Sequence, residues 1–293
     1  MSTPENSCFC DGGPSQPGVQ TQAVSSSGPF FRGIKMSETP TPRWMPWGYL
    51  NDKGAKPAPT IIHFGGDIMN LLAREDFNKV GFILREHGIQ SVATDSPCYV
   101  TDLKPGEKEG LPGWRDRIEK GEPFIADFAS KTSHLLDHLI REGYTDPDQV
   151  IACGHCRGGF LALHWAALEP RVKCVLAFTP LTNPVAAREF FGMENHPGAK
   201  TLAIHHHVDK LADRAIWSCI GNFDDRVSTE SCMSFIRKLM EAAVAKNNNK
   251  PADIEFHLSA VIGHATYAMA HEDAAAWVLA QLAKKRILHE HSK

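Results

Sequence analysis

The sequence has no apolar run long enough to cross a membrane: stretches such as 274–280 stop far short of the roughly 20 residues that a spanning helix needs. It also lacks an excess of positive charge, because 31 Lys and Arg stand against 34 Asp and Glu, for a net charge of -3. The chain therefore has no basic footprint for nucleic acid. Hydrophobic residues are 42% of the 293 and charged residues 22%. This composition is typical of a globular protein and excludes global disorder.

The first 30 residues have little that could form a core. Positions 1–28 are mostly Ser, Pro, Gly, Gln and Thr, without the basic start and the apolar stretch of about 7–15 residues of a secretory signal. We expect 1–30 to be a flexible tail and 31–293 to form one domain. Cys8 and Cys10 lie in this tail without further metal ligands nearby, so we do not assign them to a metal site.

The eight cysteines raise the question of disulfides. Four of them, Cys153, Cys156, Cys174 and Cys219, fall in or beside apolar strand-like runs. Buried strand cysteines usually pack as small hydrophobic residues. Because disulfides belong mainly to oxidising compartments and no secretory signal is present, we expect free thiols and a cytoplasmic protein.

From about residue 42, short apolar runs alternate with longer helical patterns. Strands are predicted at 60–64, 89–94, 149–153, 172–178, 215–220 and 254–261, and helices at 68–87, 124–142, 157–168, 229–246 and 267–286. Strands that are apolar through the middle are typical of a parallel sheet with helices on both faces. The alternation predicts an α/β fold with a doubly wound, mostly parallel sheet in a single domain.

Two segments, 99–122 and 182–214, interrupt this alternation. Both follow strand ends, where open α/β sheets bind their ligands. Long loops in a compact domain are often functional lids, and we expect these two to be small lid insertions. Trp114 and Phe190 are candidates to line an apolar substrate pocket, and packing within the lid is the alternative for both.

The string V-I-A-C-G-H-C-R-G-G, which starts at Val150, carries the clearest chemical signal. A strand ends in Gly-x-Cys-x-Gly and a helix follows at once, as in a nucleophile elbow with Cys in place of Ser. Gly154 and Gly158 are the small residues that let strand and helix approach closely. The helix N-terminus behind Cys156 favours a thiolate. Cys156 is therefore the predicted nucleophile, and an inert residue in a tight turn is the alternative.

The same string contains Cys153-Gly-His-Cys156, the C-x-x-C spacing of thioredoxin-like redox sites. In such sites the first cysteine opens the helix, but Cys153 still belongs to the predicted strand. Gly158 and Gly159 are also poor residues for an early helical turn. Dithiol exchange is the less favoured interpretation.

A cysteine nucleophile needs a base and a group that orients the base. In this type of fold the acid follows the nucleophile along the chain and the histidine comes last. Asp224 and Asp225 lie in a turn after the strand at 215–220, and His264 lies just after the last predicted strand. The order and the strand-end positions fit a triad, and either aspartate fits the position of the acid.

The motifs resemble those of the dienelactone hydrolase branch of the α/β-hydrolase superfamily. They are G-x-C-x-G-G at 154–159, G-x-x-D-x-x-V at 221–227 and a late Gly-His at 263–264, within a resemblance that spans about 60–282. The resemblance implies that residues 31–293 form an α/β-hydrolase domain. It also implies that Asp224 is the acid and that Asp225 is its neighbour on the solvent side.

An oxyanion hole is expected from two backbone N–H groups. One belongs to Arg157, and the resemblance favours Phe64 for the other, with Gly65 next. Dienelactone hydrolases carry an acidic side chain in this loop that helps to switch on the thiol, whereas this sequence has His63. The sequence is therefore as consistent with a resting Cys–His pair as with a substrate-gated thiol. We include His63 among the candidate substrate-binding residues. The Arg157 side chain could bind a substrate carboxylate or form a salt bridge.

The sequence thus predicts a hydrolase of a small ester, lactone or thioester that uses Cys156, His264 and Asp224 through a thioester acyl-enzyme. We expect no cofactor, no metal, no nucleic acid and no membrane partner, and a homo-oligomer is left open. The adjacent residues 205–207 are all histidines, but neighbours on a helix do not face one ion. Two alternatives remain: an acyltransferase or carbon–carbon bond-cleaving enzyme on the same triad, and a non-catalytic homologue that binds a small ligand.

Overall fold

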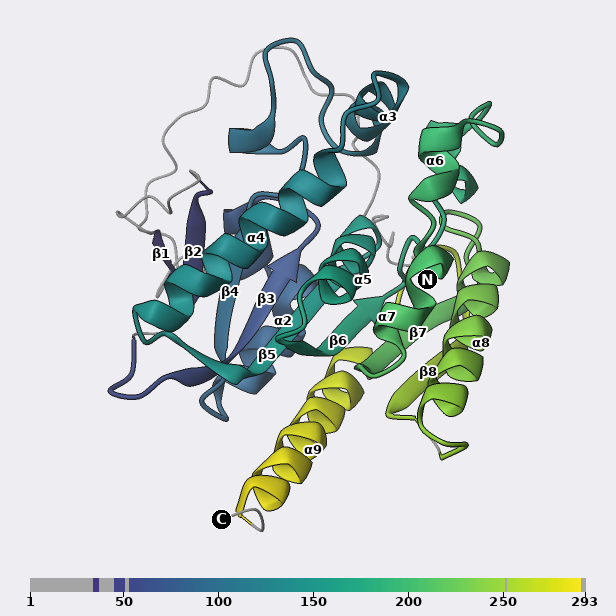
Figure 1. Cartoon of the computed structure of the whole chain (residues 1–293). Helices are drawn as coiled ribbons and strands as arrows, with labels where there is room; N and C mark the ends of the chain where they lie inside the picture. The colour runs from purple at the N-terminus through teal and green to yellow at the C-terminus, as the bar shows by residue number, and fades with distance from the viewer. Residues whose placement is uncertain (1–33, 37–44, 51–52, 251, 291–293) are drawn as a thin grey trace, which may run out of the picture.

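The computed structural model describes residues 34–36, 45–50, 53–250 and 252–290. Within this part of the chain, eight strands form one sheet in the order β1-β2-β4-β3-β5-β6-β7-β8 (Figure 1). The pairs β1–β2 and β2–β4 are antiparallel, and the other neighbouring strands are parallel. The predicted mostly parallel α/β sheet is confirmed. The predicted tail at 1–30, with Cys8 and Cys10, lies outside the described residues.

All six predicted strands are present, and two short strands precede them. The strands are β1 (Ile34–Met36), β2 (Trp47–Leu50), β3 (Ala58–Phe64), β4 (Gln90–Thr94), β5 (Thr145–His155), β6 (Val172–Phe178), β7 (Ala215–Phe223) and β8 (Ile254–Ile262). β1 and β2 have three and four residues, too few to show a periodic pattern in the sequence. β5 begins earlier than predicted. Its polar stretch 146–149 is not buried and therefore shows no apolar strand pattern in the sequence.

The helices are α1 (Ile68–Ala73), α2 (Glu75–Arg85), α3 (Leu111–Glu119), α4 (Phe124–Arg141), α5 (Arg157–Leu168), α6 (Pro197–Thr201), α7 (Val208–Leu211), α8 (Thr229–Lys246) and α9 (Ala270–Glu290). The single helix predicted at 68–87 is wrong, because Arg74 has an extended backbone (φ -94°, ψ 125°) between α1 and α2. Asp67 caps α1 by accepting the Asn70 N–H at 2.9 Å, while Glu75 and Asp76 give α2 its own acidic first turn.

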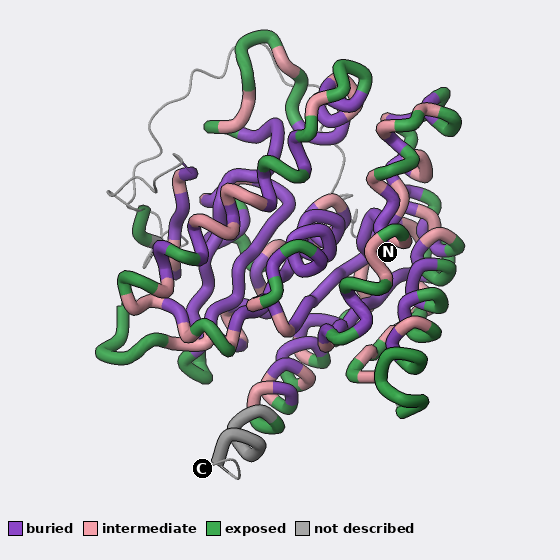
Figure 2. Tube along the Cα trace, viewed as in Figure 1, coloured by how far each residue is buried: buried purple, intermediate pink, exposed green. Residues whose placement is uncertain are grey.

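Helices cover both faces of the sheet (Figures 1 and 2). One face packs against α4, α5 and α8 through the larger cluster of buried side chains. The other face packs against α2 and α9 through a smaller cluster. Figure 2 shows the central strands and almost all of α5 as buried. Among the described helices, the one that follows the predicted elbow is therefore the most enclosed.

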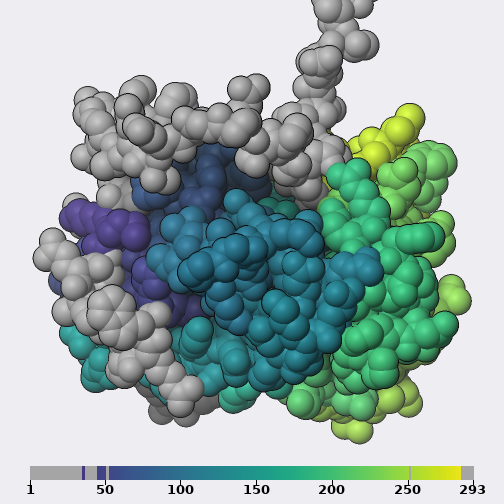
Figure 3. Space-filling view, turned by 90° about the horizontal axis from the view of Figure 1, so that it is seen from above, coloured from purple at the N-terminus to yellow at the C-terminus, as the bar shows by residue number. Residues whose placement is uncertain are grey.

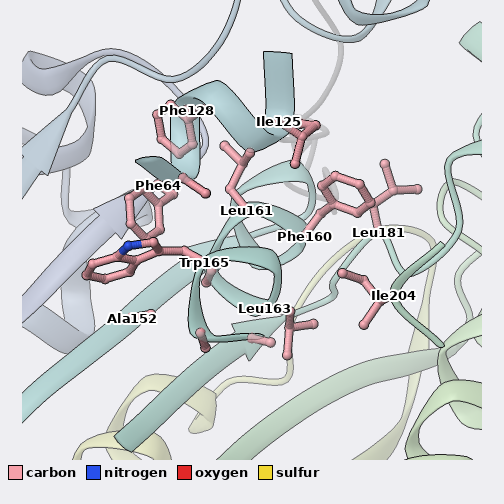
Figure 4. Close-up of a cluster of buried hydrophobic side chains, with 14 of the residues drawn as sticks. Phe64, Ile125, Phe128, Ala152, Phe160, Leu161, Leu163, Trp165, Leu181 and Ile204 are labelled. Carbon is pink, nitrogen blue, oxygen red and sulfur yellow. The ribbon is translucent and has the colours of Figure 1, made fainter. Parts of the chain in front are cut away.

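Aromatic residues fix α5 against the sheet and α4 (Figure 4). Phe64, at the end of β3, lies edge-on to Trp165 of α5 at 5.5 Å and to Phe128 of α4 at 5.7 Å between ring centroids. Such pairs add about 0.5–1.5 kcal/mol to the stabilisation from burial alone. The end of β3 and the start of α5 are thus held in one rigid unit.

The two lid segments, 99–122 and 182–214, are more regular than predicted. The first contains α3 and the 3-10 helix η2 (Val100–Asp102). The second contains α6, α7 and the 3-10 helices η3 (Pro184–Ala186), η4 (Arg188–Phe190) and η5 (Ile204–His207). Proline at the start of a helix is favourable, so Pro112 in the first turn of α3 was a signal for this helix.

The lid segments lie side by side when the molecule is viewed from above (Figure 3). The Arg115 guanidinium of α3 donates hydrogen bonds to the carbonyl oxygens of Glu189 at 3.0 Å and Phe191 at 2.8 Å. The two segments are therefore joined directly, although more than 70 residues of chain separate these partners.

Candidate active site

Cys156 lies in the sharp turn between β5 and α5. Its backbone has φ 52° and ψ -116°, a strained conformation of the kind that functional sites often hold. The Cys156 N–H donates to the Phe178 carbonyl at 2.9 Å, and the Cys156 carbonyl accepts from the N–H groups of Phe160 at 3.2 Å and Leu181 at 3.1 Å. The residue is only 2% exposed. Backbone hydrogen bonds to Phe178, Phe160 and Leu181 therefore hold the strained turn in place.

The glycines of the elbow touch each other and the end of β3. A Cβ atom on Gly154 would lie 2.2 Å from the Gly158 carbonyl carbon, and one on Gly158 would lie 2.0 Å from the Phe64 oxygen. No side chain fits at such distances without movement of the backbone. The predicted close approach of strand and helix is confirmed at both positions.

We expect Gly158→Ala to lower the free energy of unfolding by about 3 kcal/mol, the upper part of the usual range for overpacking, because its methyl group would collide with β3. Urea unfolding measures the change. Gly66→Ala is the matched control, since a Cβ there would have its nearest neighbour, Leu71 Cγ, at 3.9 Å. A Gly158→Ala protein as stable as the control would contradict this account of the elbow.

Asp224 and His264 form a buried pair across the ends of β7 and β8. The two side chains are 0% and 2% exposed, and His264 Nδ1 lies 2.7 Å from Asp224 Oδ2. Phe223 pairs with Ile262 in the sheet, and the Gly263 N–H donates to the Phe223 carbonyl at 3.1 Å. This register places His264 directly beside the acid turn. Because Nδ1 faces the carboxylate, Nε2 is the nitrogen suited to proton exchange with a nucleophile.

The acid turn orients the Asp224 carboxylate through backbone groups. Asp224 Oδ1 accepts from the N–H groups of Arg226 at 3.0 Å and Val227 at 3.2 Å. Thr229, which the sequence analysis did not single out, donates from Oγ1 to the Gly221 carbonyl at 2.6 Å and accepts the Asp224 N–H at 3.2 Å. The structure thus brings Asp224 to His264.

Asp225 differs from Asp224 in its surroundings, because it is exposed. The local sequence cannot distinguish these two carboxylates, since both lie in the same turn. Burial and the contact with His264 separate them, as the register of the resemblance implied.

The loop after β3 presents the predicted oxyanion donors. The Gly65 N–H already donates to Ser96 Oγ at 2.9 Å, which leaves Phe64 as the better candidate of the two. Arg157 is the first residue of α5, where N–H groups have no acceptor within the helix. Its side chain makes a contact that the sequence analysis did not consider: Nε donates to the Gly65 carbonyl at 2.7 Å.

The three predicted substrate-binding residues, His63, Trp114 and Phe190, are all buried. His63 is 1% exposed, with Nε2 3.4 Å from Ser91 Oγ, and burial lowers its pKa to about 3, so that it is neutral at pH 7. The Trp114 indole donates to the Pro97 carbonyl at 2.9 Å. Phe190 is fully buried. The lid segments fold inward, so these side chains pack instead of facing solvent.

The two cysteines of the C-x-x-C string lie in different clusters of buried side chains. Cys153 packs with the cluster beneath α2 and α9, whereas Cys156 packs with the one beneath α4 and α5. The six cysteines of the described residues are free thiols. Burial raises the pKa of Cys153, which disfavours its thiolate. This placement argues against a reactive dithiol.

His205, His206 and His207 lie on η5. In the part of the chain that the structure describes, no group of three or more histidine, cysteine or carboxylate side chains is arranged to hold a metal ion. Nor does any helix of the described ranges have the length and apolar character needed to cross a membrane.

A buried ion pair joins the acid turn to the second lid segment. Arg226 Nη2 lies 2.7 Å from Glu189 Oε1, and the side chains are 6% and 14% exposed. Glu189 is also the residue whose carbonyl accepts from Arg115. Neither arginine was singled out from the sequence, because the pairing depends on contacts between distant segments.

Comparisons with known proteins agree with this architecture. Residues 109–283, more than half of the chain, match the model of a family described as "Putative esterase". The matched range includes Cys156, Asp224 and His264. No curated protein sequence matches the chain significantly.

Solved structures share the fold at low sequence identity. A "Putative Dienelactone Hydrolase" from Klebsiella pneumoniae has a TM-score of 0.59 at 19% identity, over 84% of this chain and 98% of that one. Acetyl xylan esterase 1 from Thermoanaerobacterium has a TM-score of 0.57 at 17% identity, over 84% and 87% of the two chains. A "putative dipeptidyl aminopeptidase IV" from Bacteroides ovatus has a TM-score of 0.59 at 15% identity over 84% of this chain, which spans only 35% of that protein. These likenesses concern the fold alone.

Proposed function

The chain belongs to an esterase family of the α/β-hydrolase superfamily and is thus a carboxylic ester hydrolase. We propose that it cleaves its substrate with a Cys156–His264–Asp224 triad. The proposed cysteine nucleophile is a feature of the dienelactone hydrolase branch, which the motifs of this chain resemble. The substrate is a small ester, lactone or thioester.

The proposed reaction has two steps. His264 Nε2 takes the proton of the Cys156 thiol, and the thiolate forms a bond to the carbonyl carbon while the carbonyl electron pair moves to the oxygen. The amides of Phe64 and Arg157 stabilise the resulting oxyanion. When the intermediate collapses, the carbon–oxygen bond to the leaving group breaks and His264 returns the proton to it. Water, activated by His264, then hydrolyses the thioester and restores the thiol.

One observation carries the proposal: the buried 2.7 Å contact between His264 and Asp224, in a chain whose turn between β5 and α5 holds a cysteine in a strained conformation. A carboxylate on Nδ1 holds the imidazole in the tautomer that can accept a proton at Nε2. A buried histidine paired only for stability would not need to lie at the same edge of the sheet as a nucleophile elbow.

Capture of the acyl-enzyme tests the proposal. The parent protein, mixed with p-nitrophenyl acetate and quenched in acid, should carry an acetyl group on the peptide that contains Cys156, and hydroxylamine should remove it as expected for a thioester. Cys153→Ala is the control and should acylate at Cys156 as the parent does. Release of p-nitrophenol without acetyl on Cys156 would overturn the proposed nucleophile. Transfer of the acetyl group to an added alcohol or amine in preference to water would identify an acyltransferase.

A further inference from the structure

Gly65 is held on both of its peptide groups. Its N–H donates to Ser96 Oγ at 2.9 Å, and its carbonyl accepts from Arg157 Nε at 2.7 Å. Its φ is +123°, and a Cβ atom on it would lie only 3.0 Å from the Gly158 Cα, so a side chain is excluded. The residue after Phe64 therefore has very little freedom to rotate.

The Arg157 guanidinium is itself held from the other side. It lies over the Tyr99 ring with 5.0 Å between Cζ and the ring centroid, a cation–π distance. Tyr99 and Ser96 belong to one turn after β4, in which the Tyr99 N–H donates to the Ser96 carbonyl at 3.1 Å. The Ser96 N–H in turn donates to the Gly66 carbonyl at 3.0 Å. A single turn thus supports both contacts to Gly65.

We propose that Arg157 is a positioning residue for the oxyanion hole, in which its backbone amide supplies one donor and its side chain fixes the loop that presents the other, Phe64. This inference rests on the proposed function. The bond from a charged guanidinium to a carbonyl is stronger than a neutral hydrogen bond, and it is made to Gly65, the residue that follows the donor residue. The loop and the start of α5 are thereby locked together across the position of the oxyanion.

The geometry assigns this role to the side chain because the other end of Phe64 is already fixed. Its ring packs against Trp165 and Phe128, and its backbone pairs with Gly154 in the sheet. Loss of the Arg157 side chain would free only the Gly65 end, so the spacing between the Phe64–Gly65 segment and the start of α5, and with it the distance between the two amide donors, would no longer be fixed while the fold persists. Misplacement of a catalytic group by about 1 Å can cost about 100-fold in rate.

The test compares two reactions of the same thiol in full-length protein. Acylation of Cys156 by p-nitrophenyl acetate passes through an oxyanion, whereas its alkylation by iodoacetamide does not. We expect Arg157→Met to slow acylation by roughly 10- to 100-fold, to leave alkylation within about twofold, and to change the KM for the ester only slightly. Ser96→Ala should act in the same direction and more weakly, because it removes the other hold on Gly65.

Arg115→Met is the matched control, since it removes a guanidinium that also donates to backbone carbonyls but lies in the lid. It should leave the ratio of acylation to alkylation unchanged. Equal acylation rates in Arg157→Met and the parent would overturn the positioning role alone. A parallel loss of acylation and alkylation in Arg157→Met would also overturn it, because such a loss indicates a general structural effect. A loss confined to esters that carry a carboxylate, expressed in KM, would overturn it in favour of substrate binding by Arg157. Failure of the parent to acylate Cys156 would overturn the proposed function, and the positioning role would fall with it.

Discussion

Replacement of Cys156 by alanine is expected to lower kcat/KM for ester hydrolysis by at least about 10,000-fold, because removal of the nucleophile from a triad leaves only the contribution of binding and the oxyanion hole. The side chain is small and its replacement removes one sulfur atom, so the fold should persist. Steady-state hydrolysis of p-nitrophenyl acetate by the purified variant measures the loss.

Cys153→Ala is the appropriate control for this experiment, because it removes a buried thiol three residues away, on a different cluster of core side chains. It should keep the activity of the parent within a few-fold. The reverse pattern, in which Cys153→Ala abolishes turnover and Cys156→Ala does not, would overturn the elbow as the site of the chemistry. Loss in both variants together would point to a dithiol.

Asp224→Asn is expected to lower kcat by about 1,000- to 10,000-fold with little change in the free energy of binding. An asparagine of the same shape can present its N–H₂ group to His264 Nδ1, which favours the wrong tautomer for a general base. Because Asp224 Oδ1 also accepts two backbone N–H groups, rotation of the amide to avoid this would leave those donors facing an N–H₂ group.

Asp225→Asn makes the same chemical change one residue along the turn, at an exposed position. Its activity should stay within about twofold of the parent, since surface changes of this kind have small effects. Circular dichroism and urea unfolding of both variants separate a loss of the base from a loss of the fold. Equal kinetic effects in the two variants would be incompatible with Asp224 as the orienting acid.

The elbow was predictable from sequence because its requirements are local. A strand, two small residues that flank the nucleophile and an immediate helix all lie between Val150 and Leu168, and the contacts of Gly154 and Gly158 are the physical reason for that pattern. The positions of Asp224 and His264 were also predictable, since each follows a clear apolar strand and parallel strands end at one edge of a sheet.

The remaining parts of the site depend on contacts that no local pattern contains. The bond from Arg157 to Gly65 joins residues 92 positions apart, and the sequence alone offered only a substrate carboxylate or a salt bridge for that side chain. For Trp114 the sequence left both pocket lining and packing within the lid open, and the burial of its ring in α3 depends on how the segment folds. Periodicity in the 68–87 stretch likewise continues through Arg74, where the extended backbone ends α1 and the acidic first turn of α2 begins the next helix.

The ion pair between Arg226 and Glu189 connects the second lid segment to the turn that holds the Asp224 carboxylate. Cys156 and His264 are only 2% and 6% exposed, so the described conformation leaves little of either residue open to solvent. Arg226 holds the lid through its side chain and the Asp224 carboxylate through its backbone N–H. A shift of the second lid segment would therefore be transmitted through this single residue to the turn that orients His264.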